Sequence, residues 1–353
     1  MEGYRRLEKT KYNIAPGDTL RLVNLHWGSD NHLLVIGYHR LVGDGSTTEN
    51  FFNELGQLYS GVVMKLPSTP FADLALRQRT VLESRPMDED IDFWVSMHRN
   101  DSVSPPSILP ILNLIDGGGT LKKQRGLACS WHQHEAIARL DPMVAFRIKE
   151  RSRKNKATPM QFYLAAYHVL LTRLSGSKDI TIGLADTNRY NMEKISSMGF
   201  FANVLPLRFD EFVASKTFGE HLVSTKDGVR VATQHARVPY GVILDRLGLV
   251  FPDLGLGANS QTHAPLFQAV FDYKQRQAES GSIGISNMTE VLASHERTPY
   301  DIVLEMWDDP TRDPLIHVKL QSSLCGPEHA RAFVDRFVSI LTTFSMNPAL
   351  KLA

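Results

Sequence analysis

A histidine, an arginine, an aspartate and two glycines lie close together in the segment 39–45, which has the sequence HRLVGDG. A histidine ring exchanges a proton near neutral pH, and a nearby carboxylate orients such a ring or pairs with a cation. Arg40 cannot act as a general base, because its guanidinium stays protonated and has no lone pair to accept a proton. His39, Arg40, Asp44 and Gly45 are the candidate catalytic residues of this segment, and Arg40 is limited to stabilising negative charge.

The segment lies between a predicted strand and a predicted helix. Residues 32–38 form a short, continuous apolar run, which is typical of a strand buried on both faces. Residues 46–49, STTE, match a capping box and predict that a helix begins at Ser46. Neighbouring residues on a strand point to opposite faces, so His39 is not expected to substitute for a base at position 40. A polar turn between a strand and a helix is a common place for a site in α/β proteins.

Five ordered motifs resemble those of the condensation domains of non-ribosomal peptide synthetases. The segments 39–45, 70–79, 199–208, 235–240 and 263–268 are similar to HHxxxDG, YxDFAxWQR, IGxFVNTLPLR, HQDxPFE and RxPLFQ, respectively. The motifs cover most of the chain. The sequence of residues 41–48 is most similar to sequences from the family branch that is fused to fungal highly reducing polyketide synthases.

The alternation of strand and helix patterns in two blocks predicts an α/β fold with two lobes. The resemblance implies that the lobes are chloramphenicol-acetyltransferase-like and form a V-shaped pseudo-dimer with a tunnel between them. We expect an N-terminal lobe over residues 1–135, with a linker near 102–120, and a C-terminal lobe over residues 136–353. Because the signature segment begins at residue 39, the first lobe is expected to lack its N-terminal elements.

The resemblance implies acyl transfer, but the position of the family's catalytic histidine is occupied by Arg40. Losing a positioned base typically costs about 10²–10⁴ in rate. We therefore expect a domain that is vestigial or repurposed and that handles a polyketide chain. The alternative is an active acyltransferase or cyclase that relies on positioning, with Arg40 stabilising an oxyanion.

The resemblance also implies the partners, which are an acyl carrier protein and other domains of the same megasynthase. The substrate would be a polyketide acyl thioester on the carrier's phosphopantetheine, and no cofactor of the chain's own is expected. A net charge of +1 gives no field that favours nucleic acid or membrane, and no apolar run is long enough to cross a bilayer. Cys129 and Cys325 lack metal-site spacing, so we expect no metal and a cytoplasmic location.

Asp44 resembles a loop anchor that the family pairs with an arginine of the second lobe, and Arg189 matches that arginine. We expect an Asp44–Arg189 ion pair across the lobe interface, with Arg40 as a rival partner for the carboxylate.

Other residues leave two interpretations open. His39 is either a packed structural residue or a catalytic one, and the Asn203 amide either faces the tunnel or is bonded to backbone groups. The Lys and Arg residues within 147–156 either steer an acidic carrier protein or form a solvated helix face.

Overall fold

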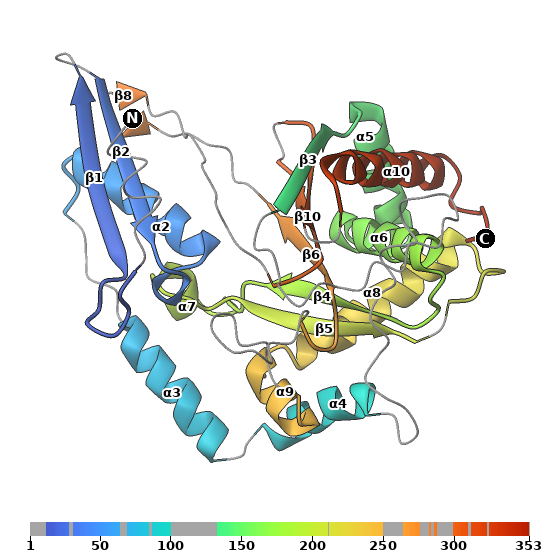
Figure 1. Cartoon of the computed structure of the whole chain (residues 1–353), viewed down its shortest axis with the longest axis horizontal. Coiled ribbons are helices and arrows are strands. Elements are labelled where there is room, and N and C mark those ends of the chain that lie inside the picture. Colours follow the sequence, from blue (N-terminus) through green and yellow to red (C-terminus); the bar gives the residue numbers. More distant parts are fainter. Residues whose placement is uncertain are drawn as a thin grey trace. The chain divides into compact units, whose positions relative to one another are not determined.

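The computed structural model describes residues 12–27, 31–63, 69–84, 87–99, 133–210, 212–249, 264–275, 282–283, 286–287, 299–309, 312–322 and 325–352. They form two compact units, each assembled from separate stretches of the chain (Figure 1). Unit 1 comprises the described residues within Met1–Pro86, Thr187–Ala202 and Ser280–Val291. Unit 2 comprises those within Met87–Asp186, Asn203–Glu279 and Leu292–Ala353.

The described part of unit 1 combines an antiparallel hairpin with short helices. Its elements are β1 (Leu20–Trp27), β2 (Asn31–Tyr38), the 3-10 turn η1 (Arg40–Val42), α2 (Gly45–Tyr59), α3 (Phe71–Glu83), α7 (Met192–Ser196), β7 (Ser282–Ile283) and β8 (Ser286–Asn287). Strands β1 and β2 pair in a register that places Leu22 opposite Ile36. The segment 187–202 belongs to this unit, although the residues before and after it along the chain belong to unit 2.

Strand β2 is not buried on both faces, so that prediction was wrong. Leu33 is 37 % and Leu34 41 % exposed to solvent. The physical reason is that β2 belongs to a two-stranded sheet, in which β1 is its hydrogen-bonded neighbour. A continuous apolar run therefore identified the strand correctly but not its environment.

Unit 2 is built on a mixed six-stranded sheet with the strand order β3-β10-β9-β6-β4-β5. The strands are β3 (Gln133–Arg139), β4 (Ile180–Asp186), β5 (Asn203–Phe209), β6 (Ala269–Lys274), β9 (Ile302–Trp307) and β10 (Leu315–Gln321). Strand β6 is parallel to β4 and β9, and the other neighbouring strands are antiparallel. The alternating patterns of residues 299–307 and 315–320, on either side of an Asp-Pro-rich turn, predict a hairpin, and the β9–β10 pair confirms it.

The helices of unit 2 pack on this sheet and on one another. They are α4 (Asp88–His98), α5 (Pro142–Lys154), α6 (Pro159–Ser175), α8 (Phe218–Gln234), α9 (Tyr240–Leu247) and α10 (Pro327–Met346). Helix α10 packs on β3 and β10, α6 on β4, and α8 and α9 on β5. Figure 1 shows α5, α6 and α10 gathered beside the β3–β10 end of the sheet.

Helix α6 forms the centre of the unit 2 core. Residues 158–161, TPMQ, match a capping box, and the structure confirms it: the Thr158 hydroxyl accepts from Gln161 N, and the Gln161 side chain accepts from Thr158 N. Tyr167 is fully buried and lies edge-on to Phe333 and Phe337 of α10, with ring centroids 6.3 Å apart. The apolar sequence of α6 is thus explained by burial on all sides.

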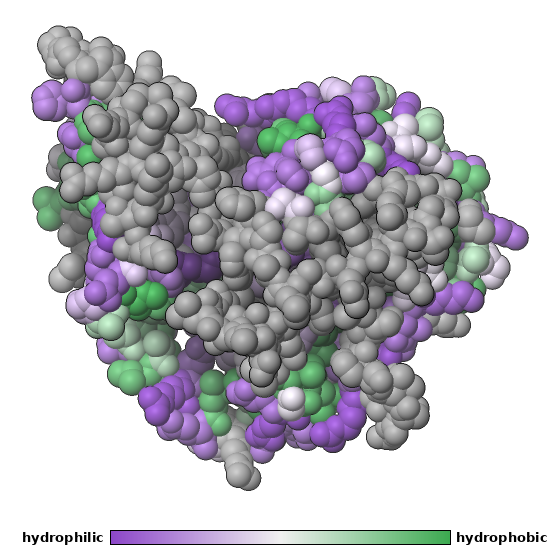
Figure 2. Space-filling model, in the orientation of Figure 1, coloured by the Kyte–Doolittle hydropathy of each residue, from purple (hydrophilic) through white to green (hydrophobic). Residues whose placement is uncertain are grey.

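On the face shown in Figure 2, the coloured surface is mainly hydrophilic and its hydrophobic residues occur in small groups.

The α/β fold class is confirmed by this architecture. The division into lobes at residues 1–135 and 136–353 stays a prediction, although α4 belongs to unit 2. The expected linker near 102–120 lies outside the described residues, as does Cys129. Within the described residues, no helix is long and apolar enough to span a bilayer.

Candidate functional site

The candidate catalytic segment begins where β2 ends, at Tyr38. His39 is the N-cap of η1, and its Nδ1 accepts a hydrogen bond from Leu41 N at 3.2 Å. Because a backbone N–H only donates, Nδ1 must hold the ring's lone pair, and the proton of the neutral ring lies on Nε2. The lone pair that a general base needs is therefore engaged in the turn, which favours the structural interpretation of His39.

Arg40 is the first residue of η1 and is exposed. The expectation that His39 and Arg40 lie on opposite faces of a strand was wrong, because both residues follow the strand. Gly45 begins α2, and a Cβ built on it meets nothing within 4 Å among the described residues. Neither space nor backbone conformation therefore demands glycine at position 45.

Helix α2 is capped by Asp44 and not by Ser46, so the predicted capping box was wrong. Asp44 Oδ1 accepts from Thr47 N at 3.0 Å, and the helix begins at Gly45. Aspartate and serine are comparably good N-caps. Asp44 is the N-cap in place of Ser46 because its carboxylate has further hydrogen-bond partners, which are residues distant in sequence.

Those partners include Arg189. Arg189 Nη2 lies 2.8 Å from Asp44 Oδ1, and the side chains are only 4 % and 8 % exposed, respectively. Asp44 Oδ2 accepts from Phe201 N at 2.9 Å, and the guanidinium lies 4.4 Å from the centroid of the Phe201 ring. The structure thus contains the expected ion pair, and Arg40 does not replace Arg189. Both partners belong to unit 1, and the expectation that the pair joins two lobes stays a prediction.

Arg189 also fixes the segment to which it belongs. Its Nη1 donates to the carbonyls of Ser197, at 2.7 Å, and of Lys194, and its Nη2 donates to the Gly199 carbonyl at 3.1 Å. These are charge-assisted hydrogen bonds, which are stronger than bonds between neutral groups. One arginine therefore shapes residues 189–199 and presents that segment to the N-terminus of α2.

Thr47 is a structural residue of this site that the sequence analysis missed. Its hydroxyl lies 3.0 Å from Gly199 N and 2.8 Å from Gly199 O, and it also accepts from Arg189 Nη2 at 3.1 Å. A Cβ built on Gly199 would lie 2.2 Å from the Phe71 ring, so the close approach requires glycine. No local pattern signals a contact between residues that lie 152 positions apart in sequence.

The Asn203 amide is bonded to backbone groups, which was the second of its two interpretations. It is buried at the start of β5, where its Nδ2 donates to the carbonyls of Ala236, at 3.1 Å, and Val238, at 2.8 Å. Its Oδ1 accepts from Tyr240 N at 3.0 Å. The amide thereby ties β5 to the loop that leads into α9, and both of its N–H donors are used.

His235 has a partner set that sequence reasoning also missed. Its Nδ1 lies 2.6 Å from Asp90 Oδ1, and its ring stacks on Phe93 with centroids 4.0 Å apart. Trp94 Nε1 donates to the His235 carbonyl at 2.9 Å. The motif at 235–240 thus packs against α4 within unit 2. Among the described residues, no group of three or more metal-ligating side chains is placed to hold an ion.

Comparison with known proteins gives the family. The condensation-domain family matches residues 2–353. The chain is 75 % identical over 353 residues to the compactin nonaketide synthase polyketide synthase component of Penicillium citrinum, and 63 % identical over 352 residues to lovastatin nonaketide synthase mokA of Monascus pilosus. All of this chain is covered in both comparisons, but it spans only 12 % and 11 % of those relatives, respectively.

Solved structures agree with this match. The structure of the condensation domain from the monacolin K polyketide synthase MokA superimposes with a TM-score of 0.92 at 63 % identity, over 100 % of this chain and 78 % of that one. The X-domain from teicoplanin biosynthesis, at 20 % identity, superimposes with a TM-score of 0.79 over 98 % of this chain and 76 % of that one, and shows the fold alone. The family match, the identities and the shared fold show that this chain belongs to the condensation-domain family.

Proposed function

We propose that this chain is the condensation domain of a fungal polyketide megasynthase of the nonaketide synthase type, and that it has lost base-assisted amide formation. The observation that carries the proposal is Arg40, which occupies the position of the family's second signature histidine in a segment whose Asp44 anchor is intact. The loss therefore concerns a proton acceptor and not the framework that would hold one.

No side chain of the segment takes over as proton acceptor. Arg40 has no lone pair to offer. The Nδ1 lone pair of His39 accepts from Leu41 N, and the two oxygens of Asp44 accept from Thr47, Phe201 and Arg189. A group already engaged in this way is poorly placed to remove a proton from an incoming amine.

The proposed role is to handle the polyketide chain as part of the megasynthase scaffold. The supporting observation is that relatives of 60–75 % identity are nonaketide synthases of which the matched region is a small part. The proposed partners are an acyl carrier protein of the same polypeptide, its phosphopantetheine-bound acyl thioester and the other domains. A cytoplasmic location is part of the same proposal.

The alternative is an active acyltransferase or cyclase, and the exposure of Arg40 favours it. A cation at the turn could stabilise an oxyanion, and holding both reactants is by itself worth about 7–11 kcal/mol in favourable cases. In that reaction a nucleophile on the acceptor would add to the thioester carbonyl, and the carrier thiolate would leave and take up the acceptor's proton.

A single-turnover assay separates the two functions. A carrier-bound acyl thioester is mixed with the chain and an amine or water, and the unaltered chain is compared with Arg40→Ala. We expect release at the uncatalysed rate in both proteins. Release that is fast in the unaltered chain and falls in Arg40→Ala would overturn the proposal and establish the alternative.

A further inference from the structure

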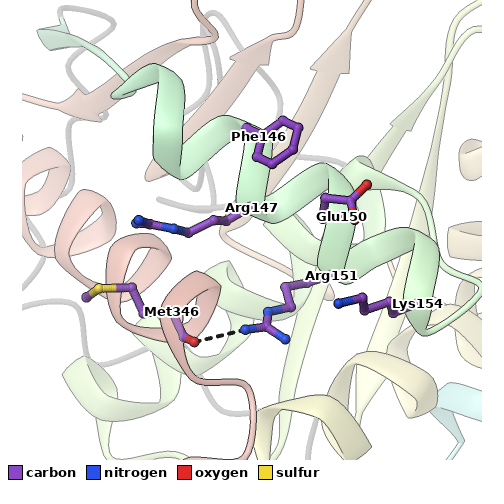
Figure 3. A pocket seen from close by; sticks show the side chains of 6 residues that line it. All are labelled: Phe146, Arg147, Glu150, Arg151, Lys154 and Met346. Atoms are coloured by element: carbon purple, nitrogen blue, oxygen red, sulfur yellow. Dashed lines mark hydrogen bonds between the residues drawn. The ribbon is translucent and has the colours of Figure 1, made fainter.

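Helix α5 carries a surface in unit 2 that the candidate site does not use. We propose that this surface docks an acidic helix of a carrier domain, and the proposal rests on the proposed function in that the carrier belongs to the same megasynthase. We define the α5 surface as Met143, Phe146, Arg147, Arg151 and Lys154 of α5 with Met346 of α10. Figure 3 shows the shallow hollow of about 450 Å³ that most of these residues line together with Glu150.

An excess of positive charge lies in and around this surface. The whole chain has a net charge of +1, yet residues 147–156 contain six lysines and arginines and one acidic residue, Glu150. Lys149 pairs with Asp308 at 3.4 Å, and Arg153 pairs with Glu150 at 3.3 Å. These two pairs neutralise part of the cluster and leave an excess of positive charge.

Arg151 has a structural task within the surface. Its Nη2 donates to the Met346 carbonyl at 3.1 Å, and its Nε donates to the Ser345 carbonyl at 3.3 Å (Figure 3). These carbonyls belong to the last turn of α10, and the carbonyls of a last turn have no N–H partner within their own helix. Arg147 and Lys154, by contrast, have no ion pair or hydrogen bond to any described residue, so both cations are available to a partner.

Apolar side chains lie among these cations. Helix α5 already buries one stripe, which includes Val144 and Ile148. Met143 and Phe146 lie outside that stripe and are 55 % and 59 % exposed, and Met346 is 53 % exposed. Single exposed apolar side chains are ordinary, but three of them within one surface form an apolar patch. The surface therefore offers both charge and apolar contact.

The spacing of the cations indicates the kind of partner. Arg147 and Lys154 are seven residues apart on one helix face, which is about 10 Å along its axis. That separation is too large for a single phosphate but fits two acidic side chains two turns apart on a partner helix. An apolar residue between those acids would contact Phe146 and Met346. The outward placement of the donors likewise favours a protein surface over an enclosed anion.

Tethering makes such a modest surface sufficient. The relatives are long polypeptides of which the matched region is 8–12 %, so their other domains are held near it at high effective concentration. A mixed polar and apolar surface of this size suits a carrier domain that must dock and leave in every cycle.

The test is binding of the isolated apo carrier domain of the same megasynthase, which lacks the phosphopantetheine arm. Binding to the chain is followed by NMR shift perturbation at several salt concentrations. Arg147→Glu/Lys154→Glu should weaken binding about tenfold or more and flatten its salt dependence, because two attractive contacts become repulsive. Phe146→Ser should weaken binding but leave the salt dependence unchanged. Arg151 is left unchanged in these variants, because it donates to the last carbonyls of α10.

The matched control is Lys178→Glu/Arg230→Glu. Both residues are exposed in unit 2 and outside the α5 surface, and the change in net charge is the same. This variant should bind within about twofold of the unaltered chain if the effect is local and not one of net charge. Circular dichroism checks that each variant is folded.

Equal binding by Arg147→Glu/Lys154→Glu and the unaltered chain would overturn the proposal, as would no binding of the carrier at about 1 mM, the concentration that tethering supplies. So would variant-sensitive binding of anionic vesicles or an oligonucleotide in place of the carrier. None of these results changes the single-turnover assay. Amide formation by the unaltered chain would overturn the proposed function and leave the docking surface standing.

Discussion

Asp44 and Arg189 form a buried ion pair in which the carboxylate also serves as the N-cap of α2. The same Oδ1 lies 2.8 Å from Arg189 Nη2 and 3.0 Å from Thr47 N. The pair therefore joins the candidate catalytic segment to residues 189–201 and fixes the start of a helix at the same time. This arrangement holds the segment at residues 39–45 in a fixed form.

Asp44→Ala should destabilise unit 1. Removing one partner of a buried pair leaves the other charge uncompensated, and we expect a loss of about 3–5 kcal/mol in the free energy of unfolding. The measurement is urea unfolding followed by a probe in unit 1. Glu83→Ala, which removes the exposed partner of Arg79 on α3, is the matched control and should have no measurable effect. An Asp44→Ala protein as stable as the control would contradict the anchoring role.

Thr47→Val should loosen the contact between α2 and residue 199. Valine has the shape of threonine but cannot replace the hydroxyl that bonds to both backbone groups of Gly199. The Gly199 N–H loses its acceptor, whereas the Gly199 carbonyl keeps Arg189 Nη2, and we expect a loss of about 1–3 kcal/mol in the free energy of unfolding. Thr47→Ser keeps the hydroxyl and should retain most of the stability in the same urea titration. A valine variant as stable as the unaltered chain would contradict the role of the hydroxyl.

Gly199→Ala tests a steric requirement. The added Cβ would lie 2.2 Å from the Phe71 ring, so either the ring or the backbone must move. We expect a loss of about 1–3 kcal/mol, typical of overpacking. Gly45→Ala is the control in the same unit, because a Cβ there meets nothing within 4 Å among the described residues. Thermal unfolding of the two variants should show a lower Tm for Gly199→Ala alone.

Unit 2 should lose stability as the pH falls below neutrality. Burial lowers the pKa of His98 and of His221 from 6.5 to about 4, and it lowers the pKa of His168, which bonds to His221, well below 6.5. Between pH 6.5 and 4 the unfolded chain binds protons that the folded chain does not. The stabilisation is therefore complete above pH 6.5 and declines by about 1.4 kcal/mol per pH unit for each histidine on acidification.

The check is the slope of unfolding free energy against pH, with His98→Gln as the informative variant. The Nε2 of His98 donates to the Pro206 carbonyl at 3.0 Å, and a glutamine amide supplies an equivalent donor without a titratable group. Between pH 6.5 and 4, the slope should be smaller in this variant by about 1.4 kcal/mol per pH unit, which is the contribution of one proton. An unchanged slope would show that His98 titrates alike in the folded and unfolded chains.

Local patterns predicted the secondary structure of this chain better than its environment. The capping box of α6 was predicted from neighbouring residues, because capping acts within a few positions. The burial of β2 was predicted wrongly, since the same apolar run occurs in central and edge strands. The number of strands beside β2 is a property of the whole fold and cannot be predicted from the sequence of β2 alone.

The candidate site divides in the same way. The resemblance supplied Asp44 and Arg189, but the choice of Asp44 over Ser46 as the cap depends on Arg189 and Phe201, which are distant in sequence. Thr47 and Gly199 were missed for the same reason. The engagement of the Asn203 amide was foreseen only as one of two possibilities, because carbonyls such as that of Val238 reach it through the fold.

The central claim is that the segment at residues 39–45 keeps its framework and lacks only a proton acceptor. The most direct measurement is single-turnover amide formation by Arg40→His with a carrier-bound acyl thioester and an amine. The account predicts a gain of about 10²–10⁴ over the unaltered chain, rising with pH as the new imidazole loses its proton. A folded Arg40→His protein as inactive as the unaltered chain would contradict it, because more than the base would then be missing.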